Sequence, residues 1–313
     1  MRTVSADEVH GALDFPALID ALAAMFKAGC EVPLRHHHAI EVPGAPAATL
    51  LLMPAWQPGR ALGIKTVTVF PGNAARSLPA VMGQYLLLDA TTGAPKALID
   101  GTALTLRRTA AASALASRFL SRHDAGTLLM VGTGALAPHL VRAHCAVRPI
   151  KRVAIWGRNS EHARAMAAKL ELAGVAAAAA ENLEQAAGAA DIISCATLAT
   201  APLIRGAWLR PGQHLDLVGG FTPAMREADD DAVRRAAVFV DTRAGATKEA
   251  GDIVQPLASG ALKPEAIKGD LFDLCRGTAP GRTAADTITF FKSVGTALED
   301  LAAAQLVAER LGA

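Results

Sequence analysis

The chain has 313 residues, of which 51% are hydrophobic and 19% are charged, and its formal net charge is +2 at pH 7. This length fits two modest domains, and the high apolar content excludes an intrinsically disordered chain. The small net charge gives no reason to expect nucleic acid or a membrane surface as a partner.

The cysteine pattern and the N-terminal residues indicate where the protein works. Cys30, Cys145, Cys195 and Cys275 are scattered and form no Cys-x-x-Cys pair, which is typical of reduced thiols rather than of disulfides or a zinc site. The first residues, MRTVSADEVH, contain no apolar signal core, and no run approaches the roughly 18 apolar residues of a membrane span. We therefore expect a soluble cytoplasmic protein without a metal.

Residues 1 to about 118 combine one helical pattern with several strand-like ones. In FPALIDALAAMFKAG the apolar residues have helical spacing and a glycine ends the pattern, which predicts a helix. The strand-like runs ATLLLMPAW, GIKTVTVF, GQYLLLDA and PKALID follow. Because turns rather than helices separate these runs, they predict an antiparallel or mixed sheet.

Three consecutive histidines in RHHHAIE precede these strands. Adjacent residues cannot all point at one ion from a strand, and no outlying cysteine or carboxylate pattern completes four ligands, so metal binding is disfavoured. The favoured interpretation is a solvated loop, and the alternative is that one histidine contacts a substrate.

Lys65 and Arg108 are charged residues at positions with an apolar pattern. With the strand period of two, Lys65 shares a face with Val67 and Val69. Arg108 lies in the centre of the apolar stripe of LTLRRTAAASALAS at helical spacing. A buried ammonium without a partner costs several kcal/mol, so Lys65 either lies at the wet end of its strand or meets an anion. Arg108 either pairs internally or reaches a site.

From about residue 124, strand-like and helix-like stretches alternate: GTLLMVG, APHLVRAHCAV, RVAIWG, SEHARAMAAKLELAG, DIISCAT, HLDLVGG and AVFVDT. This alternation predicts a parallel, doubly wound sheet. The stretch AGVAAAAAENLEQAAGAA is interpreted as an ordinary surface layer, since alanine is the best helix former and packs closely on sheets. The expected fold class is α/β, with a Rossmann-type domain and a smaller α+β domain.

The stretch LLMVGTGALAPHL places Gly132, Gly134 and Ala137 as GxGxxA between a strand and a helix. Gly132 permits a tight turn, Gly134 lets the backbone approach a pyrophosphate, and the helix N-terminus supplies N–H donors. Within an alternating run this predicts dinucleotide binding by Gly132, Gly134, Ala135 and Leu136. The alternative is a packing glycine pair in a cofactor-free domain.

The end of the next strand, RVAIWGRNS, bears on which dinucleotide is bound. A site that prefers NAD usually has an acidic residue here for the ribose hydroxyls, whereas this chain has Arg158 and Asn159. A guanidinium suits the 2′-phosphate through charge-assisted hydrogen bonds. We therefore expect NADP(H) to be preferred, with NAD(H) possible if Arg158 is only a solvated surface arginine.

Seven stretches together resemble the ornithine cyclodeaminase/mu-crystallin family over nearly the whole chain: VPLR, LLMPA, GIKTVTVFPGN, LRRTAAASA, GTGALA, VGGFTPAMRE and TFFKSVGTALEDLAAA. The resemblance implies an NAD(P)-binding Rossmann domain, 119–293, and a substrate-binding and dimerisation domain, 1–118 with 294–313, in a homodimer. It also implies NAD(P)-dependent ornithine cyclodeamination, alanine dehydrogenation or reduction of cyclic imino acids such as Δ1-pyrroline-2-carboxylate.

The resemblance assigns roles to individual residues. It implies that Arg35, Lys65 and Arg108 surround the substrate carboxylate, where two guanidiniums can fork onto one carboxylate. Lys65 can also supply a proton, since burial between cations lowers the pKa of its ammonium. The cofactor cleft is expected to involve Arg108, Thr109, Thr197, Val218 and Ser293.

Two positions depart from the family pattern. Diamino-acid members have a glutamate where this chain has Leu51, and cyclodeaminases and alanine dehydrogenases have an essential aspartate where it has Phe221. Phenylalanine can neither hold an ammonium nor transfer a proton, so Phe221 is expected to contact the substrate by packing. The favoured function is therefore NADPH-dependent reduction of a small cyclic imino acid. The alternatives are an ornithine cyclodeaminase with an acid from elsewhere, and a non-catalytic NADP-dependent binding protein of mu-crystallin type.

The remaining acidic residues receive structural interpretations. Asp286, Glu299 and Asp300 are interpreted as caps and surface charges, and a catalytic role of Asp241 or Glu249 has no support. The final stretch, from TFFKSVG onward, predicts a short strand or loop and then an amphipathic helix. Because no further sheet follows, this helix is expected to pack on an element already formed.

Overall fold

The computed structural model describes residues 1–312, which form two compact units. Unit 1 comprises Met1–Arg108 and the C-terminal residues from Thr296, and unit 2 comprises Thr109–Gly295. The division falls inside one long helix, α3 (Gly101–Leu120), whereas the sequence pattern places a boundary at a helix end. One helix therefore contributes residues to both units.

Unit 1 contains a six-stranded sheet in the order β1-β6-β5-β4-β3-β2, antiparallel except for the parallel pair β1–β6. Its elements, besides the first part of α3, are β1 (Arg2–Val4), α1 (Ala6–Ala12), α2 (Phe15–Ala28), β2 (His36–Ile40), β3 (Ala48–Gln57), β4 (Ala61–Val69), the 3-10 helix η1 (Pro71–Arg76), β5 (Val81–Leu88), β6 (Pro95–Asp100) and α11 (Ala297–Leu311).

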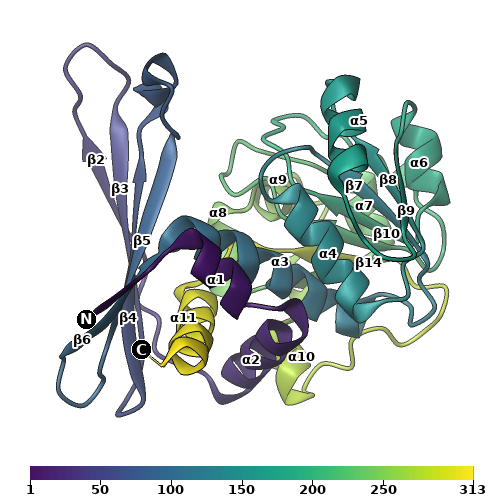
Figure 1. The fold of residues 1–313 in the computed structure, drawn as a ribbon. Helices are drawn as coiled ribbons and strands as arrows, with labels where there is room; N and C mark the ends of the chain where they lie inside the picture. Colours follow the sequence, from purple (N-terminus) through teal and green to yellow (C-terminus); the bar gives the residue numbers. More distant parts are fainter. Residues whose placement is uncertain (313) are drawn as a thin grey trace. The chain divides into compact units, whose positions relative to one another are not determined.

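The helices of unit 1 cover one face of its sheet, and Figure 1 shows α1, α2 and α11 on the same side of the strands. The inward residues of β4, namely Ala61, Gly63 and Lys65, are buried, while the alternate residues Leu62 and Ile64 are half-buried. This follows from the strand period of two. The expected C-terminal helix is confirmed as α11, and it packs on α2 and on strands β3 to β5.

The histidine stretch was expected to be a solvated loop, and this expectation is wrong. His36–Ile40 form strand β2, which pairs antiparallel with β3 so that His37 lies opposite Leu51. The three histidines are nevertheless exposed. Backbone pairing with β3, rather than side-chain burial, holds this edge strand, and a sequence pattern of three polar residues does not reveal it.

Unit 2 contains an eight-stranded, all-parallel sheet in the order β13-β12-β14-β11-β10-β7-β8-β9, which confirms the expected doubly wound α/β class. Its elements are β7 (Thr127–Val131), α4 (Ala137–Val147), β8 (Arg152–Trp156), α5 (Ser160–Lys169), β9 (Ala176–Ala179), α6 (Leu183–Ala189), β10 (Ile192–Cys195), η2 (Gly206–Trp208), β11 (His214–Leu217), α7 (Asp230–Arg235), β12 (Ala237–Val240), α8 (Arg243–Glu249), α9 (Gly251–Ser259), η3 (Pro264–Ala266), β13 (Ile267–Asp270), α10 (Leu271–Arg276) and β14 (Thr289–Lys292).

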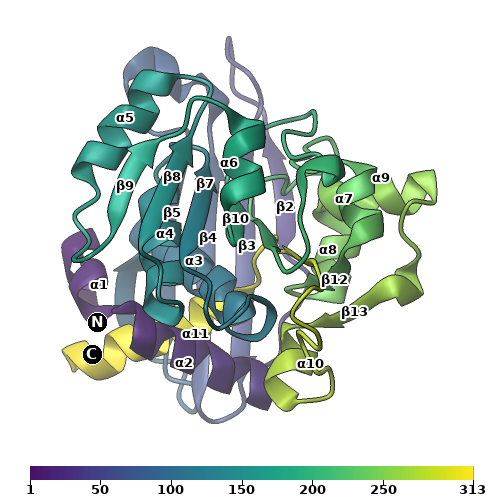
Figure 2. The same ribbon diagram turned by 90° about the vertical axis from the view of Figure 1, so that its right-hand side faces the viewer.

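Helices cover both faces of this sheet, and α4 and α6 lie on opposite faces (Figures 1 and 2). Alternate strand residues such as Leu129, Ile193 and Leu215 join a core with the helices on the α6 side. On the α4 side the strands carry polar residues as well, including Asp216 and His214, which are fully buried. The carboxyl ends of β7, β10, β11 and β14 meet at one edge, where open α/β sheets bind ligands.

One segment of unit 2 differs from the sequence interpretation, and a second takes one of the two structures expected for it. In the alanine-rich stretch, interpreted as a surface layer because alanine favours helices, Ala176–Ala179 form the edge strand β9, paired with β8. Alanine has a low preference for strands, so the pairing partner decides here. The run TFFK, expected to be a short strand or loop, forms the strand β14, which inserts between β11 and β12 in the centre of the sheet.

No single helix within residues 1–312 is long and apolar enough to cross a membrane, although the bent pair α1 and α2 passes the test together by length and composition.

Candidate functional site

A cluster of buried charges in unit 1 contains two of the predicted site residues. Lys65, on the inward face of β4, is 2% exposed, and its Nζ lies 2.7 Å from Oδ2 of Asp300 on α11. Arg108, on α3, donates from Nε to Oδ1 of Asp300 at 2.9 Å and from Nη1 to Oε2 of Glu299 at 2.6 Å. Asp300 thus joins the two cations, and three elements meet at this point.

Burial and neighbouring charges set the protonation of this cluster. Burial lowers the pKa of Lys65 to about 8, against the attraction of Asp300 and with further lowering by Arg108 and Arg35. Burial alone would raise the pKa of Asp300, but Arg108 and Lys65 hold it below its usual range. Burial would lower the pKa of Arg108, but Asp300 and Glu299 raise it above its ordinary value. Lys65 is therefore the group of the cluster that exchanges its proton most easily near neutral pH.

A third cation, Arg35, acts on this cluster. Arg35 lies directly before β2, half-buried, and its charge acts on Lys65. The ion pairs of the cluster join two cations, Lys65 and Arg108, to two carboxylates, Glu299 and Asp300. Guanidinium and ammonium groups are the donors that suit a carboxylate ligand.

The interpretation of Glu299 and Asp300 as caps and surface charges is wrong, because both are fully buried. Thr296 caps α11 instead, accepting from the backbone N–H of Leu298. The sequence indicated these two acidic residues only indirectly, because Lys65 and Arg108, two cations at apolar positions, required anions. Burial of the whole first turn of α11 shows which anions they meet.

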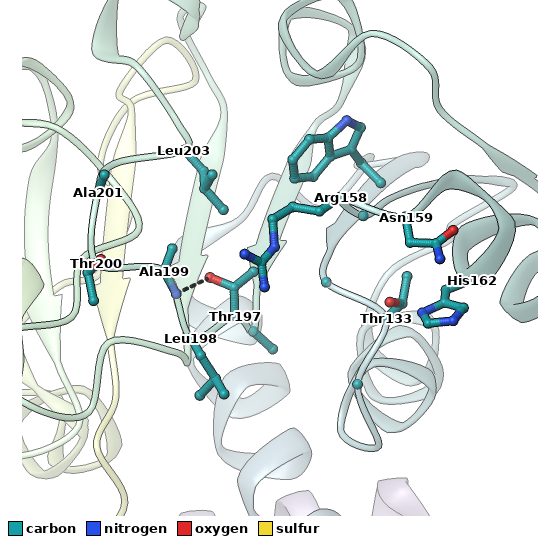
Figure 3. Close-up of a pocket in the computed structure, with 15 residues that line it drawn as sticks. Thr133, Arg158, Asn159, His162, Thr197, Leu198, Ala199, Thr200, Ala201 and Leu203 are labelled. Carbon is teal, nitrogen blue, oxygen red and sulfur yellow. Dashed lines mark hydrogen bonds between the residues drawn. The ribbon is translucent and has the colours of Figure 1, made fainter.

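Unit 2 contains a cavity of about 770 Å³ at the carboxyl edge of its sheet. Its walls come from the loops after β7, β8 and β10, and its lining residues are Gly132, Thr133, Gly134, Trp156, Gly157, Arg158, Asn159, His162, Ala196, Thr197, Leu198, Ala199, Thr200, Ala201 and Leu203. In Figure 3, Thr133, Asn159 and His162 lie on one side and Thr197 to Leu203 on the other, with the Arg158 side chain extending between them. Trp156 and His162 had no sequence signal as site residues.

The loop after β7 fits a dinucleotide pyrophosphate. Gly132 has φ +119°, and a Cβ there would lie 2.5 Å from the Ala196 carbonyl oxygen, so only glycine fits this turn. A Cβ at Gly134 would meet nothing within 4 Å, which leaves open space next to the backbone. Helix α4 starts after Leu136 without a side-chain cap. The Ala137 N–H donates to the Gly134 carbonyl and Pro138 has no N–H, so the positive end of the helix dipole is what would attract an anion here.

The loop after β8 carries the two residues expected to select the dinucleotide. Arg158 and Asn159 both line the cavity. The Asn159 side chain caps α5, accepting from the backbone N–H of Glu161 at 2.9 Å, so it mainly fixes the start of that helix. Arg158 remains as the cation of this wall that can meet a phosphate.

Of the other residues predicted to bind the cofactor, Thr197 lines the cavity and several lie outside its wall. Thr197 lines the cavity, and its hydroxyl accepts from the backbone N–H of Ala199 at 3.3 Å (Figure 3). In the described chain the cavity wall does not include Thr109, Ala135, Leu136, Val218 or Ser293. Val218 and Ser293 directly follow β11 and β14, at the same edge of the sheet, and both are buried. Phe221, beyond the Val218 turn, is 47% exposed.

Asp241, a further acidic residue considered from the sequence, has a structural role. Asp241 is fully buried and accepts from the backbone N–H groups of Thr242, Val294 and Gly295, so it fixes the chain after β14. Among residues 1–312, no three or more His, Cys, Asp or Glu side chains are arranged to hold a metal ion. All four cysteines are free thiols.

Comparison with known proteins gives consistent matches. The chain matches the model of the ornithine cyclodeaminase/mu-crystallin family over residues 3–313. It is 45% identical over 266 residues to the Δ1-pyrroline-2-carboxylate reductase of Paracoccus denitrificans, covering 85% of this chain and 84% of that protein. It is 39% identical over 319 residues to the Δ1-pyrroline-2-carboxylate reductase of Colwellia psychrerythraea, covering 99% of each. The solved Δ1-pyrroline-2-carboxylate reductase of Thermococcus litoralis, in complex with NADH and L-proline, matches with TM-score 0.92 and 32% identity over 99% of this chain and 97% of that one.

Proposed function

This chain belongs to the ornithine cyclodeaminase/mu-crystallin family, and we propose that it is an NADPH-dependent reductase of a small cyclic imino acid, of the Δ1-pyrroline-2-carboxylate or Δ1-piperideine-2-carboxylate type. The observation that carries the proposal is the buried pair of cations, Lys65 and Arg108, held by Asp300 and Glu299, with the charge of the half-buried Arg35 acting on Lys65. The names of the relatives support the substrate class.

Unit 1 would bind the carboxylate of the imino acid. Arg35 and Arg108 supply guanidinium donors that suit a carboxylate in a bidentate arrangement. Asp300 and Glu299 keep Arg108 charged and oriented before the substrate arrives. The cost of ordering these side chains is thus already met in the free protein, which favours binding.

Lys65 would supply the proton that the imine nitrogen requires. With a pKa of about 8, its ammonium is charged at neutral pH yet releases a proton more easily than an exposed lysine. Asp300, 2.7 Å from Lys65 Nζ, holds the ammonium in place. The proton moves from Lys65 Nζ to the ring nitrogen, and a proton from solvent restores the ammonium.

The dinucleotide cavity of unit 2 would hold the cofactor. Gly132 and Gly134 allow the pyrophosphate to approach the start of α4, and Arg158 would meet the 2′-phosphate, which favours NADP(H) over NAD(H). When bound, the cofactor supplies the hydride that the imine carbon accepts. We propose Thr197, Val218 and Ser293, at the carboxyl edge of the sheet, as the residues near its nicotinamide end.

Two apolar residues disfavour a diamine substrate. Leu51 lies on β3 and Phe221 follows β11, and neither can pair with the second ammonium of ornithine. Burying that ammonium without a carboxylate would cost several kcal/mol. A cyclic imino acid has no second amine, and we propose that the Phe221 ring packs against its methylene groups.

We further propose that the protein is a homodimer that uses the open face of the unit 1 sheet. The outward side chains there are apolar and half-buried within the unit: Leu52, Trp56, Leu62, Ile64, Leu86, Leu88 and Leu98. All helices of the unit that pack on its strands lie on the opposite face (Figure 1). A second copy of the same sheet offers matching apolar surface.

The function is tested by substrate turnover. The purified protein should oxidise NADPH in the presence of Δ1-pyrroline-2-carboxylate or its six-membered homologue, and it should release no ammonia from L-ornithine with NAD or NADP. Absorbance at the NADPH band and an ammonia assay measure the two reactions. Efficient conversion of L-ornithine to proline and ammonia would contradict the proposal and support a cyclodeaminase.

Substitution of Lys65, with an exposed lysine as the control, tests whether Lys65 is the proton donor of the reaction. Lys65→Met should lower kcat by roughly 10²-fold or more, the usual contribution of a general acid. Lys96→Met, which removes an exposed lysine of β6 in the same sheet, should leave kcat within about twofold. If Lys65→Met changes only KM, Lys65 is an anchor and the proton has another source. Tight imino acid binding without any turnover would favour a mu-crystallin-type binding protein.

A further inference from the structure

A second cluster of buried charges lies in unit 2, and none of the function proposed above uses it. Glu227, Asp252 and Lys292 are all fully buried. Lys292 is the last residue of β14, and Asp252 is in the first turn of α9. Two carboxylates face a single ammonium here, with Lys292 Nζ 3.3 Å from Asp252 Oδ2.

Glu227 connects this cluster to the dinucleotide cavity. Its Oε1 accepts two hydrogen bonds from Thr197, one from the backbone N–H at 2.7 Å and one from the hydroxyl at 2.8 Å. Thr197 lines the cavity two residues beyond the end of β10. One carboxylate oxygen of Glu227 therefore fixes both the backbone N–H and the hydroxyl of Thr197.

The cluster also holds the turn after β11. Lys292 Nζ donates to the carbonyl oxygen of Gly219. Asp252 Oδ1 accepts from the backbone N–H groups of Glu227 at 2.8 Å and of Ala228 at 3.1 Å. The three charged side chains thus connect Thr197, the Gly219 turn and the start of α9 into one network.

Gly219 and Gly220 pack so closely on the charged side chains that no larger residue fits at either position. A Cβ at Gly219 would lie 2.4 Å from Glu227 Oε1 and 2.2 Å from the carbonyl oxygen of Thr197. A Cβ at Gly220, where φ is +55°, would lie 2.4 Å from Asp252 Oδ2. Close packing means that a change in one of these groups shifts the others.

We propose that Glu227 is a positioning residue for the dinucleotide, which holds Thr197 and the Gly219 turn in the arrangement that the cofactor meets at the carboxyl edge of the sheet. The inference rests on the proposed dinucleotide binding of unit 2. Replacing a whole buried network of ion pairs by apolar groups of similar volume is often neutral or stabilising, so fold stability alone gives little reason for the charges of Glu227, Asp252 and Lys292. Burial, opposed by Lys292 and reinforced by Asp252, raises the pKa of Glu227 to about 7, which shows the energetic cost of this position.

The test measures NADH binding directly, so that it does not depend on turnover. Energy transfer from protein tryptophan to bound NADH reports the dissociation constant, since Trp156 lines the cavity. Glu227→Ala should weaken NADH binding at least tenfold and raise KM for NADH more than KM for the imino acid. Glu227→Gln should keep the dissociation constant within about threefold, because the amide oxygen can accept both Thr197 hydrogen bonds.

Coupling to Thr197 gives a second criterion. Thr197→Val, which removes only the hydroxyl, should weaken NADH binding about fivefold, and adding it to Glu227→Ala should produce little further loss, because the two residues act through one pair of hydrogen bonds. If Glu227→Ala does not fold, Thr197→Val and Glu227→Gln still decide the matter. Unchanged NADH affinity in Thr197→Val, or loss of affinity in Glu227→Gln equal to that of an apolar variant, would overturn the proposal.

Asp216→Asn is the matched control. Asp216 is another fully buried carboxylate of unit 2, but it accepts from Ser194 Oγ at 2.7 Å and meets His144 of α4, not the cavity. This variant should lower the melting temperature and leave NADH affinity unchanged. An equal loss of affinity in Asp216→Asn would make Glu227 merely structural. NADH binding that depends on Glu227 without any imine reduction would refute the proposed reaction and leave this inference intact.

Discussion

Lys65 occupies an inward position of β4 because Asp300, 235 positions later in the chain, lies 2.7 Å from its ammonium. Asp300 also meets Arg108, so one carboxylate compensates two cations. Removing one partner of such a buried pair typically costs about 3–5 kcal/mol, because an uncompensated charge remains. The cations proposed for substrate binding are therefore also part of the packing of unit 1.

At the same scale, Arg158 should determine the choice of dinucleotide. If its guanidinium meets the 2′-phosphate, NADPH should bind more tightly than NADH by about 1.5–3 kcal/mol, the range of a hydrogen bond to a charged group. Arg158→Ala should remove most of this difference and leave NADH affinity nearly unchanged. Isothermal titration calorimetry with both cofactors measures the gap.

Arg164 offers a control for this comparison. It is an arginine of the neighbouring helix α5 whose side chain is 59% exposed, and it lies 3.8 Å from Glu181 rather than in the cavity wall. Arg164→Ala should preserve the preference for NADPH. Equal affinity of the unmutated protein for NADPH and NADH would contradict the proposal that Arg158 selects NADPH.

At the scale of elements, the open face of the unit 1 sheet should form the homodimer interface. Ile64→Asp and Leu86→Asp place a carboxylate in the middle of this apolar face, on adjacent strands in directly paired positions. Each should shift the protein from dimer to monomer in light scattering after gel filtration, because an unpaired charge resists burial between two sheets.

The control for dimerisation is Lys268→Glu, which changes an exposed charge on β13 in unit 2. It should leave the dimer unchanged. An unmutated protein that is monomeric at micromolar concentration, or a dimer unaffected by both aspartate substitutions, would exclude this face as the interface.

At the scale of the whole molecule, the pH dependence of stability should contain a contribution from His214. Its imidazole is fully buried, with Nδ1 3.0 Å from Thr289 Oγ1, and burial lowers its pKa to about 3. Between pH 6.5 and 3 the unfolded chain takes up a proton at this residue and the folded protein does not. Stability that is fully present above pH 6.5 is therefore lost as the pH falls.

The comparison of wild type with His214→Asn isolates this contribution. Relative to the variant, the wild-type free energy of unfolding should fall by about 2 kcal/mol between pH 7 and pH 5, as measured in urea. The comparison is needed because Glu227, whose pKa is raised, has the opposite effect in the same range, and both proteins retain it. A pH-independent difference between the two proteins would show that His214 is accessible to protons in the folded state.

The sequence by itself determined the elements with strong periodicity and the residues with local backbone requirements. The helices α2 and α4, the strands β3 to β8 and the GxGxxA turn follow from local patterns of apolar residues and glycine, which act within a few positions of the chain. The position of Arg158 at a strand end likewise follows from its local motif.

Only the tertiary structure decided which charges meet and which weak strands form. The sequence pattern of Glu299 and Asp300 is that of solvated residues in a first helical turn. They are buried against Lys65 and Arg108 because α11 packs on β4. Strands β2 and β9 form because a neighbouring strand supplies hydrogen-bond partners, not because histidine or alanine prefers a strand. The link between Glu227 and Thr197 depends on loops from different strands meeting at one edge. These are contacts between residues far apart in sequence, and a local pattern carries no record of such a partner.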